Sequence, residues 1–175
     1  MNFSGLKKKT TFQYYEKQLK KIKRTDKNIP KKILSVGILA DSRLFGSYDI
    51  SRNLSQKLNM LHKDFEIIIF ENLKDDFVTQ HYNTFNEKDF GMYGKIKAPN
   101  VRDFIESPYD LLINYNNDNN IFMNVVALRS MAKFKVGFAF DELCELYDFM
   151  INIEGNKIDV FNDELARYLQ ILKLI

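Results

Sequence analysis

The sequence predicts an α/β fold: a single Rossmann-like, doubly wound and mostly parallel sheet of five to six strands, preceded by a basic amphipathic helix. Three observations lead to this prediction. Nearly continuous apolar runs recur along the chain, as in strands that are buried on both faces. Segments with the apolar spacing of helices separate these runs. The length of 175 residues suits one domain, and 45% apolar residues suffice for a large core.

The first element is predicted as a helix over residues 10–24, which begins at Thr10 or Thr11 and ends before Pro30. Its apolar residues follow one stripe at helical spacing; they are Phe12, Tyr15, Leu19 and Ile22. We therefore expect a basic amphipathic helical arm and linker over residues 1–31, and the Rossmann-like α/β domain over residues 32–175.

The next elements alternate between strand and helix. An apolar run predicts the first strand at residues 33–40, and a helix follows over 48–62. Three consecutive isoleucines, which are β-branched, predict the second strand at 65–70. Residues 71–89 have no readable period, and the weak alternation over 90–96 indicates a short or edge strand.

The second half of the chain continues this alternation, and right-handed crossovers are expected throughout. We expect the strands at 33–40 and 109–115 to run side by side in the same direction, and the order of the other strands is left open. The remaining elements are predicted as a helix at 100–106, strands at 109–115, 134–140 and 149–153, a helix at 121–131, a turn or short helix at 142–147, and a helix at 163–174 with Asn162 as its N-cap.

Charge is distributed unevenly along the chain. Residues 1–32 contain eleven basic and two acidic side chains, a net charge of +9, whereas the rest has −6. This basic segment predicts contact with nucleic acid or an acidic protein surface through residues 7–32, and it also suits an anionic membrane surface. Alternatively, the helix packs its apolar stripe on the sheet and its lysines are only solvated. The candidate polyanion-binding residues are Lys7, Lys8, Lys9, Lys17, Lys20, Lys21, Lys23 and Arg24.

A second candidate site lies at the carboxyl ends of the predicted strands, where open α/β sheets bind ligands. Polar residues follow three of these strands, and together they form a predicted ligand-binding rim. Alternatively, these residues cap helices and form turns, which is the common role of Asp, Ser and Asn at such positions. The rim residues are Asp41, Ser42, Arg43, Asn114, Asn116 and Asp141.

No catalytic motif is found. The chain lacks both the G-x-G-x-x-G and the G-x-x-x-x-G-K-[ST] phosphate-binding patterns, and no serine lies in G-x-S-x-G. The two histidines, His62 and His81, lie outside any metal-binding motif, and the one cysteine, Cys144, is expected to be buried and inert. We therefore expect no catalytic residues, metal or cofactor, and we lean against an enzyme.

The apolar runs are shorter than the roughly 20 residues of a transmembrane helix, and the N-terminus lacks the features of a secretory signal. A cytoplasmic location is expected. Segments 36–42, 109–115 and 126–137 resemble a family of small uncharacterised proteins from Bacteroidetes, which implies the same location and supplies no activity. Residues 127–137 also look like a helix-to-strand passage in the Rossmann-type half of some glycosyltransferases, whose second half-domain this chain lacks.

The leading hypothesis is a non-catalytic binding or accessory module whose basic N-terminal helix engages nucleic acid or a protein partner. The alternative is a small-ligand-binding protein, or a transferase-like enzyme, that uses the rim. A third possibility is a subunit of a larger assembly with an exposed aromatic patch, formed by Phe77, Tyr82, Phe85, Phe90 and Tyr93.

Overall fold

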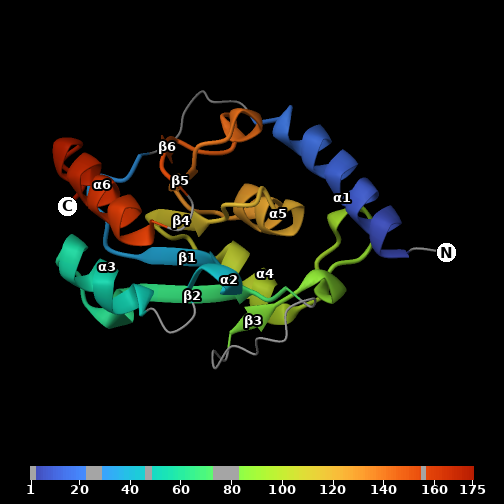
Figure 1. Ribbon diagram of the computed structural model, residues 1–175, viewed down its shortest axis with the longest axis horizontal. Coiled ribbons are helices and arrows are strands. Elements are labelled where there is room, and N and C mark those ends of the chain that lie inside the picture. Colours follow the sequence, from blue (N-terminus) through green and yellow to red (C-terminus); the bar gives the residue numbers. More distant parts are fainter. Residues whose placement is uncertain (1–2, 23–28, 46–48, 73–82, 155–156) are drawn as a thin grey trace.

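The computed structural model describes residues 3–22, 29–45, 49–72, 83–154 and 157–175 (Figure 1). In these residues one sheet of six strands, all parallel, has the order β3-β2-β1-β4-β5-β6, which confirms the predicted fold class. The strands are β1 (Val36–Asp41), β2 (Phe65–Phe70), β3 (Thr84–Phe85), β4 (Leu111–Tyr115), β5 (Phe134–Phe138) and β6 (Phe149–Ile151).

Helices connect the strands. The α-helices are α1 (Phe3–Leu19), α2 (Ser42–Phe45), α3 (Ile50–Leu58), α4 (Pro99–Glu106), α5 (Ile121–Arg129) and α6 (Ile158–Ile171). Short 3₁₀ helices occur at η1 (His62–Asp64), η2 (Glu87–Asp89), η3 (Met92–Gly94) and η4 (Asp141–Leu143).

Strand β1 lies in the middle of the sheet and pairs in parallel with both β2 and β4. Val36 of β1 lies opposite Phe65 on one side and Leu111 on the other. The expectation that the first strand and the strand near residue 111 run side by side is therefore confirmed. From β1 the chain builds the sheet outward through β2 and β3, and it then returns to place β4, β5 and β6 on the other side. The direction of winding thus reverses between β1 and β4.

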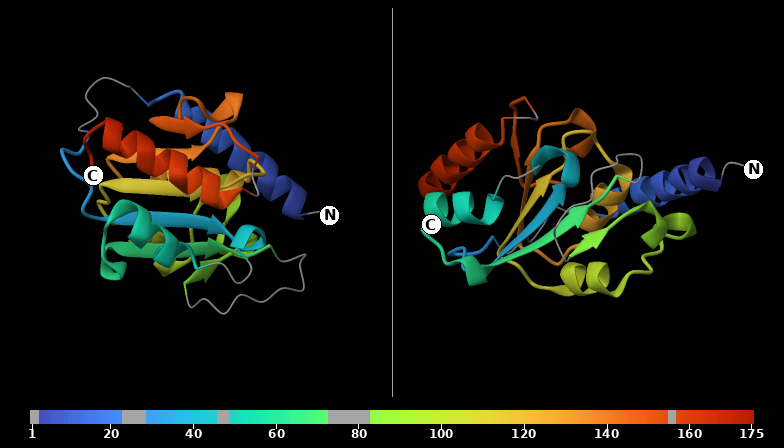
Figure 2. Two further views of the ribbon diagram at one scale, coloured as in Figure 1. Left: turned by 60° about the vertical axis from the view of Figure 1, so that its left-hand side comes forward. Right: turned by 60° about the horizontal axis from the view of Figure 1, so that its bottom comes forward.

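Helices cover both faces of the sheet. Figure 2 shows α3 and α6 on one face and α1, α4 and α5 on the other. Alternate residues of β1 face the two layers: Ile38 packs in the core under α3 and α6, and Leu39 packs in the core under α4 and α5. Burial on both faces explains why the strands read as continuous apolar runs.

Helix α1 packs against α5, and it differs from the prediction at both ends: it ends at Leu19, before the predicted end near residue 24, and it starts earlier than predicted. It begins at Phe3, so that Thr10 and Thr11 lie inside the helix and are buried; their predicted role as caps is wrong. The hydroxyl of Thr10 donates to the carbonyl of Lys7 and accepts from the backbone N–H of Tyr93, and both bonds fit a helix interior packed against a loop.

The apolar stripe of α1 is confirmed only in part. Tyr15 is 4% exposed and packs in the core, and Leu19 is partly buried against it. Phe12, in contrast, is 50% exposed. The packed side of α1 faces η3 and α5, where the ring of Tyr14 lies against Gly94, and Phe12 lies outside this contact.

Residues 90–96 do not form a strand. Phe90 and Ile96 make one isolated antiparallel bridge around η3, in which Tyr93 has a φ of 57° and Gly94 a φ of 66°. These left-handed conformations close a tight loop instead of extending the chain. The exposed aromatic patch predicted for a larger assembly is not formed by Phe85 and Phe90, because both are buried. Tyr93 is 63% exposed. Phe77, Tyr82 and also His81 lie outside the described residues.

Two further predictions are wrong. Helix α6 begins at Ile158, so Asn162 lies within the helix, fully buried, where its side-chain oxygen accepts a hydrogen bond from the hydroxyl of Tyr115. Cys144 is exposed, because Leu143 and Leu146 take the inward positions of the turn after β5.

Candidate functional site

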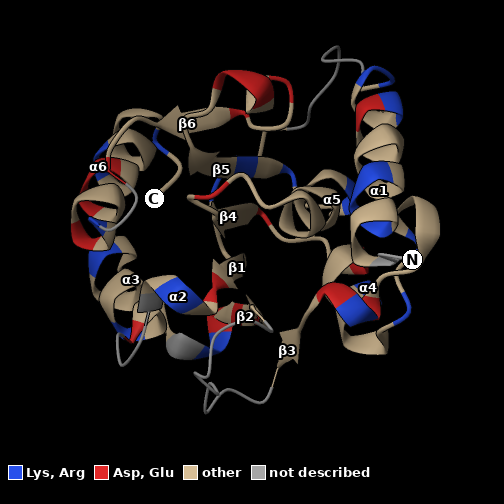
Figure 3. Ribbon diagram, turned by 45° about the vertical axis from the view of Figure 1, so that its right-hand side comes forward, with Lys and Arg blue, Asp and Glu red and all other residues tan. Residues whose placement is uncertain are grey.

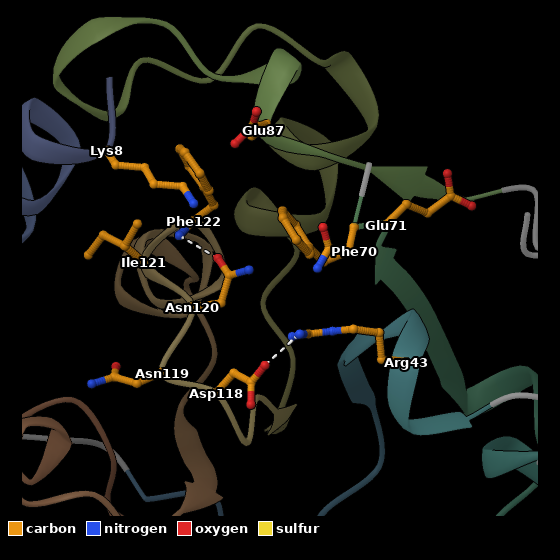
Figure 4. A pocket seen from close by; sticks show the side chains of 11 residues that line it. Lys8, Arg43, Phe70, Glu71, Glu87, Asp118, Asn119, Asn120, Ile121 and Phe122 are labelled. Atoms are coloured by element: carbon orange, nitrogen blue, oxygen red, sulfur yellow. Dashed lines mark hydrogen bonds and ion pairs between the residues drawn. The ribbon is translucent and has the colours of Figure 1, made fainter. Parts of the chain in front are cut away.

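A cavity of about 350 Å³ opens at the carboxyl ends of β1, β2 and β4, beside the point where the winding of the sheet reverses (Figure 4). This is the position at which open α/β sheets bind ligands, and the volume is in the range of small-molecule sites. The described lining residues are Lys8, Arg43, Phe70, Glu71, Asn72, Glu87, Asp118, Asn119, Asn120, Ile121 and Phe122.

Arg43 is held in place by the last residue of β1. Asp41 is fully buried, and both of its carboxylate oxygens accept from Arg43, from Nε at 2.9 Å and from Nη2 at 2.6 Å. The remaining nitrogen, Nη1, lies 2.6 Å from the carboxylate of Asp118. The hydrogen bond to Asp41 is the main reason why the pKa of Arg43 lies above its ordinary value, so the guanidinium keeps its charge. Its orientation is thus fixed from behind, and Nη1, paired with Asp118, is the nitrogen at the cavity.

A network of asparagines shapes the loop between β4 and α5. The buried side chain of Asn116 accepts from the backbone N–H of Asn120 at 2.9 Å and donates to the side-chain oxygen of Asn124 at 2.8 Å. Asn124 in turn donates to the side chain of Asn119 at 2.6 Å. These bonds hold the loop in one conformation, in which Asp118 is presented at the cavity with a half-exposed side chain.

Apolar side chains form the floor of the cavity. The rings of Phe70 and Phe122 are stacked with their centroids 6.3 Å apart, and Phe90 lies 4.9 Å from Phe122 in the layer below. Phe70 and Phe122 are 5% and 1% exposed, so that the core holds their faces and only small parts of the rings reach the cavity. Ile121, which is partly buried, adds to this floor.

Helix α1 and η2 together form the wall opposite Arg43. The hydroxyl of Ser4 donates to the carboxylate of Glu87, with both oxygens at 3.3 Å, and the ammonium of Lys7 donates to the carbonyl of Glu87 at 2.9 Å. These contacts fix the start of α1 against η2 and bring Lys8 to the cavity. Figure 4 shows the side chains of Lys8 and Glu87 reaching inward on this side, whereas the side chain of Glu71 turns away.

The structure brings only part of the predicted rim to the cavity. Of the six predicted residues, all of them described, Arg43 alone lines the cavity, and Asp41 lies directly behind it. Ser42 is buried at the start of α2. Asn114 is buried and donates to the hydroxyl of Tyr147 at 2.7 Å, and Asn116 shapes the loop described above.

The sixth rim residue, Asp141, is exposed at the start of η4, on the far side of β5 from the cavity. Sequence reasoning missed Asp118 and Glu87. Asp118 belongs to the polar cluster that the sequence already placed at the end of a strand, so a signal for it existed. Glu87 lies within residues 71–89, which have no readable period, and its contacts with Ser4 and Lys7, far away in the sequence, fix it at the site.

The predicted polyanion-binding residues divide into three groups. Lys7 and Lys8 belong to the wall of the cavity. Lys9, Lys17, Lys20 and Lys21 are exposed on α1 and the turn after it, and Figure 3 shows several basic positions along α1. Lys23 and Arg24 lie outside the described residues. Lys7 and Lys8 thus connect the predicted polyanion-binding segment to the cavity at the strand ends, which the sequence treated as separate sites.

Comparison with known proteins identifies a family. The model of a family of unknown function (DUF6913) covers residues 7–172 of the chain, which confirms the expected likeness to an uncharacterised family. No curated protein and no solved structure matches. Among the described helices, none combines the length and the apolar character needed to cross a membrane.

Proposed function

Because the chain belongs to a family of unknown function (DUF6913), we propose its function from the site itself: the protein binds a small polar molecule in the cavity at the ends of β1, β2 and β4. One observation carries this proposal. Charged side chains from four distant parts of the chain converge on one hollow, with an apolar floor beneath them. The four are Lys8, Arg43, Glu87 and Asp118.

The chemistry of the lining suits the binding of a polar ligand. The described lining residues provide ammonium, guanidinium, carboxylate and amide groups, and no Ser, Thr, Cys or His is among them. Such groups recognise charge and hydrogen-bonding partners. We therefore propose a binding module, in line with the leading hypothesis from the sequence, and place its ligand at the strand ends, as the alternative hypothesis did.

The first test is a binding screen with a pair of matched variants. Lys8→Trp places an indole at the cavity wall, whereas Lys9→Trp places the same group on the neighbouring exposed position outside the cavity. Ligand-observed NMR is run against a library of anionic, cationic, zwitterionic and neutral polyol metabolites. We expect at least one compound to bind the wild type and Lys9→Trp and to lose about tenfold or more in affinity with Lys8→Trp. The proposal fails if no compound binds, or if Lys8→Trp binds as the wild type does.

A second candidate function uses the basic residues of α1 and the hollow between the end of α1 and α5. Lys21 and Arg129 line a shallow hollow of about 270 Å³ together with Gln18, and no acidic residue is among its described lining. We propose as this second function that nucleic acid or an acidic protein surface contacts residues 7–32, in which Lys9, Lys17 and Lys20 are also exposed.

Fluorescence anisotropy with RNA and DNA at two salt concentrations tests this second function. Affinity should fall as salt rises, and Lys17→Gln combined with Lys20→Gln should weaken it, whereas Lys95→Gln, an exposed lysine outside residues 7–32, should not. Absence of binding, or binding unchanged by the double variant, removes this function without affecting the first.

Three further proposals rest on the sequence: a boundary between the arm and the Rossmann-like domain at residues 31 and 32, a cytoplasmic location, and restriction of the family to Bacteroidetes. Folding of the chain without residues 1–31 tests the boundary, and fractionation of cells that produce the tagged protein tests the location. A family member from another phylum would remove the restriction.

A further inference from the structure

Charges of both signs alternate around the mouth of the cavity. Figure 4 shows the ammonium of Lys8 and the carboxylate of Glu87 entering from one side, and the guanidinium of Arg43 and the carboxylate of Asp118 entering from the other. The inward-pointing charges are therefore two positive and two negative. A ligand with one kind of charge would pair with two of these groups and be repelled by the other two.

We propose, on the basis of the function proposed above, that the ligand is a small zwitterion: a molecule with one anionic and one cationic group and an apolar body, of which an amino acid is the simplest example. Its anionic group lies between Lys8 and Arg43, and its cationic group lies between Glu87 and Asp118. Both charges of such a ligand then make charge-assisted hydrogen bonds, which are stronger than neutral ones.

The anionic group is assigned to Arg43 for a structural reason. Asp41 occupies Nε and Nη2, so Nη1 is the part of the guanidinium that faces the cavity. A carboxylate, that of Asp118, already lies 2.6 Å from this nitrogen. Asp118 has a side chain that is 51% exposed, so it can share Nη1 with a second carboxylate and keep its other oxygen for an ammonium group.

The cationic group is assigned to Glu87 and Asp118. The carboxylate of Glu87 is positioned by the hydroxyl of Ser4, a neutral donor, so its negative charge is available to a ligand. The N-terminus of α5 also borders the cavity, and backbone N–H groups at a helix start can bind an anion. The N–H of Phe122 is already bonded to the side chain of Asn120, so we assign the anionic group of the ligand to Lys8 and Arg43. The apolar body of the ligand rests on Ile121 and on the edges of Phe70 and Phe122.

Isothermal titration of the full chain tests this assignment. L-leucine and 5-aminovalerate are the zwitterionic probes. N-acetyl-L-leucine, which lacks the ammonium, and L-leucinamide, which lacks the carboxylate, are the matched analogues. We expect L-leucine or 5-aminovalerate to bind at least about tenfold more tightly than either analogue. Glycerol, a neutral polyol, should bind more weakly still.

Charge-removing variants locate each group. Lys8→Gln should weaken zwitterion binding by roughly tenfold but change L-leucinamide binding little, because that analogue has no carboxylate. Glu87→Gln should weaken zwitterion binding to a similar degree but leave N-acetyl-L-leucine unaffected. Lys9→Gln and Glu106→Gln are exposed controls outside the cavity and should bind as the wild type does.

The outcomes separate this inference from the proposed function. If a singly charged or neutral compound binds as tightly as the zwitterions and is lost in Lys8→Trp, the zwitterion assignment is overturned and the cavity remains a binding site. The same holds if neither zwitterion binds while another compound does. If no compound of the library binds, both proposals are overturned.

Discussion

Arg43 contacts both carboxylate oxygens of Asp41, two residues before it, through Nε and Nη2. Asp41 is fully buried at the end of the central strand, whereas the side chain of Arg43 is 34% exposed. The pair therefore connects the core of the sheet to the cavity: Asp41 is buried, and Arg43, which it holds, lines the cavity.

Removal of Arg43 should destabilise the protein. Arg43→Gln leaves the buried carboxylate of Asp41 without its cationic partner, and we expect the free energy of unfolding in urea to fall by about 2–3 kcal/mol. The double variant Asp41→Asn with Arg43→Gln should lose less than the sum of the single variants, since no unpaired charge remains. Arg129→Gln, exposed at the end of α5, is the control. A loss within about 0.5 kcal/mol for Arg43→Gln would contradict this view of the pair.

Asp110 should make stability depend on acid pH. Burial alone would raise the pKa of Asp110, but hydrogen bonds from the ammonium of Lys133 and from the backbone N–H groups of Leu34 and Ser35 outweigh it and lower the pKa below 3.8. A lowered folded-state pKa gives stability that is complete above the ordinary value and is lost as the pH falls through the folded value.

Asp110→Asn should therefore cost about 1–2 kcal/mol at pH 7, and the difference from the wild type should shrink as the pH falls below about 4. Urea unfolding from pH 7 to pH 2 measures it. Asp103→Asn, exposed on α4, should follow the wild type at each pH. A constant difference across this range would mean that the charge of Asp110 contributes nothing.

Gly137 is required by the ring of Tyr147. A Cβ at position 137 would lie 2.5 Å from Cζ of Tyr147, whose ring is buried and whose hydroxyl accepts from Asn114. We expect Gly137→Ala to lower the melting temperature and to cost about 1–3 kcal/mol. Gly91→Ala, where the nearest side-chain atom would lie 3.4 Å away, should be far milder. Equal effects of the two would show that the ring moves without cost.

The orientation of α1 predicts opposite results for two aromatic residues. Tyr15→Ala should cost about 3 kcal/mol, because the side chain is 4% exposed and packs in the core. Phe12→Ala should stay within about 0.5 kcal/mol, because Phe12 is 50% exposed. Denaturant titration of both variants checks the docking of the helix. Equal losses would favour the stripe that the sequence predicted.

The fold was predictable because strands that are buried on both faces appear in the sequence as continuous apolar runs. The isoleucines at 67–69 belong to β2, which the structure places at Phe65–Phe70, as predicted. Helix starts were harder, because polar residues such as Thr10 and Asn162 look like caps from the sequence. Each is instead buried within a helix by a partner far along the chain, Tyr93 for Thr10 and Tyr115 for Asn162.

The site was predictable only where it follows a strand directly. Arg43 comes after the first apolar run, so the rule for strand ends identified it. Lys8 and Glu87 meet because α1 packs against η2 across 80 or more positions of the chain, as the Lys7 and Ser4 contacts with Glu87 show. Local periodicity contains no information about such a contact. Asn114 and Asn116 also lie at the end of a strand, but they do not line the cavity. Asn114 donates to the hydroxyl of Tyr147, and Asn116 holds the loop after β4.

Amide chemical-shift mapping is the most direct measurement of the cavity's role. The ¹⁵N-labelled full chain is titrated with the metabolite library, and the compound with the highest affinity is followed to saturation. We expect the largest shifts at the backbone amides of Arg43 and residues 118–122, with smaller ones around Lys8 and Glu87. Largest shifts at residues 17–21, at the end of α1, or no shifts with any compound, would contradict a binding site at the ends of β1, β2 and β4.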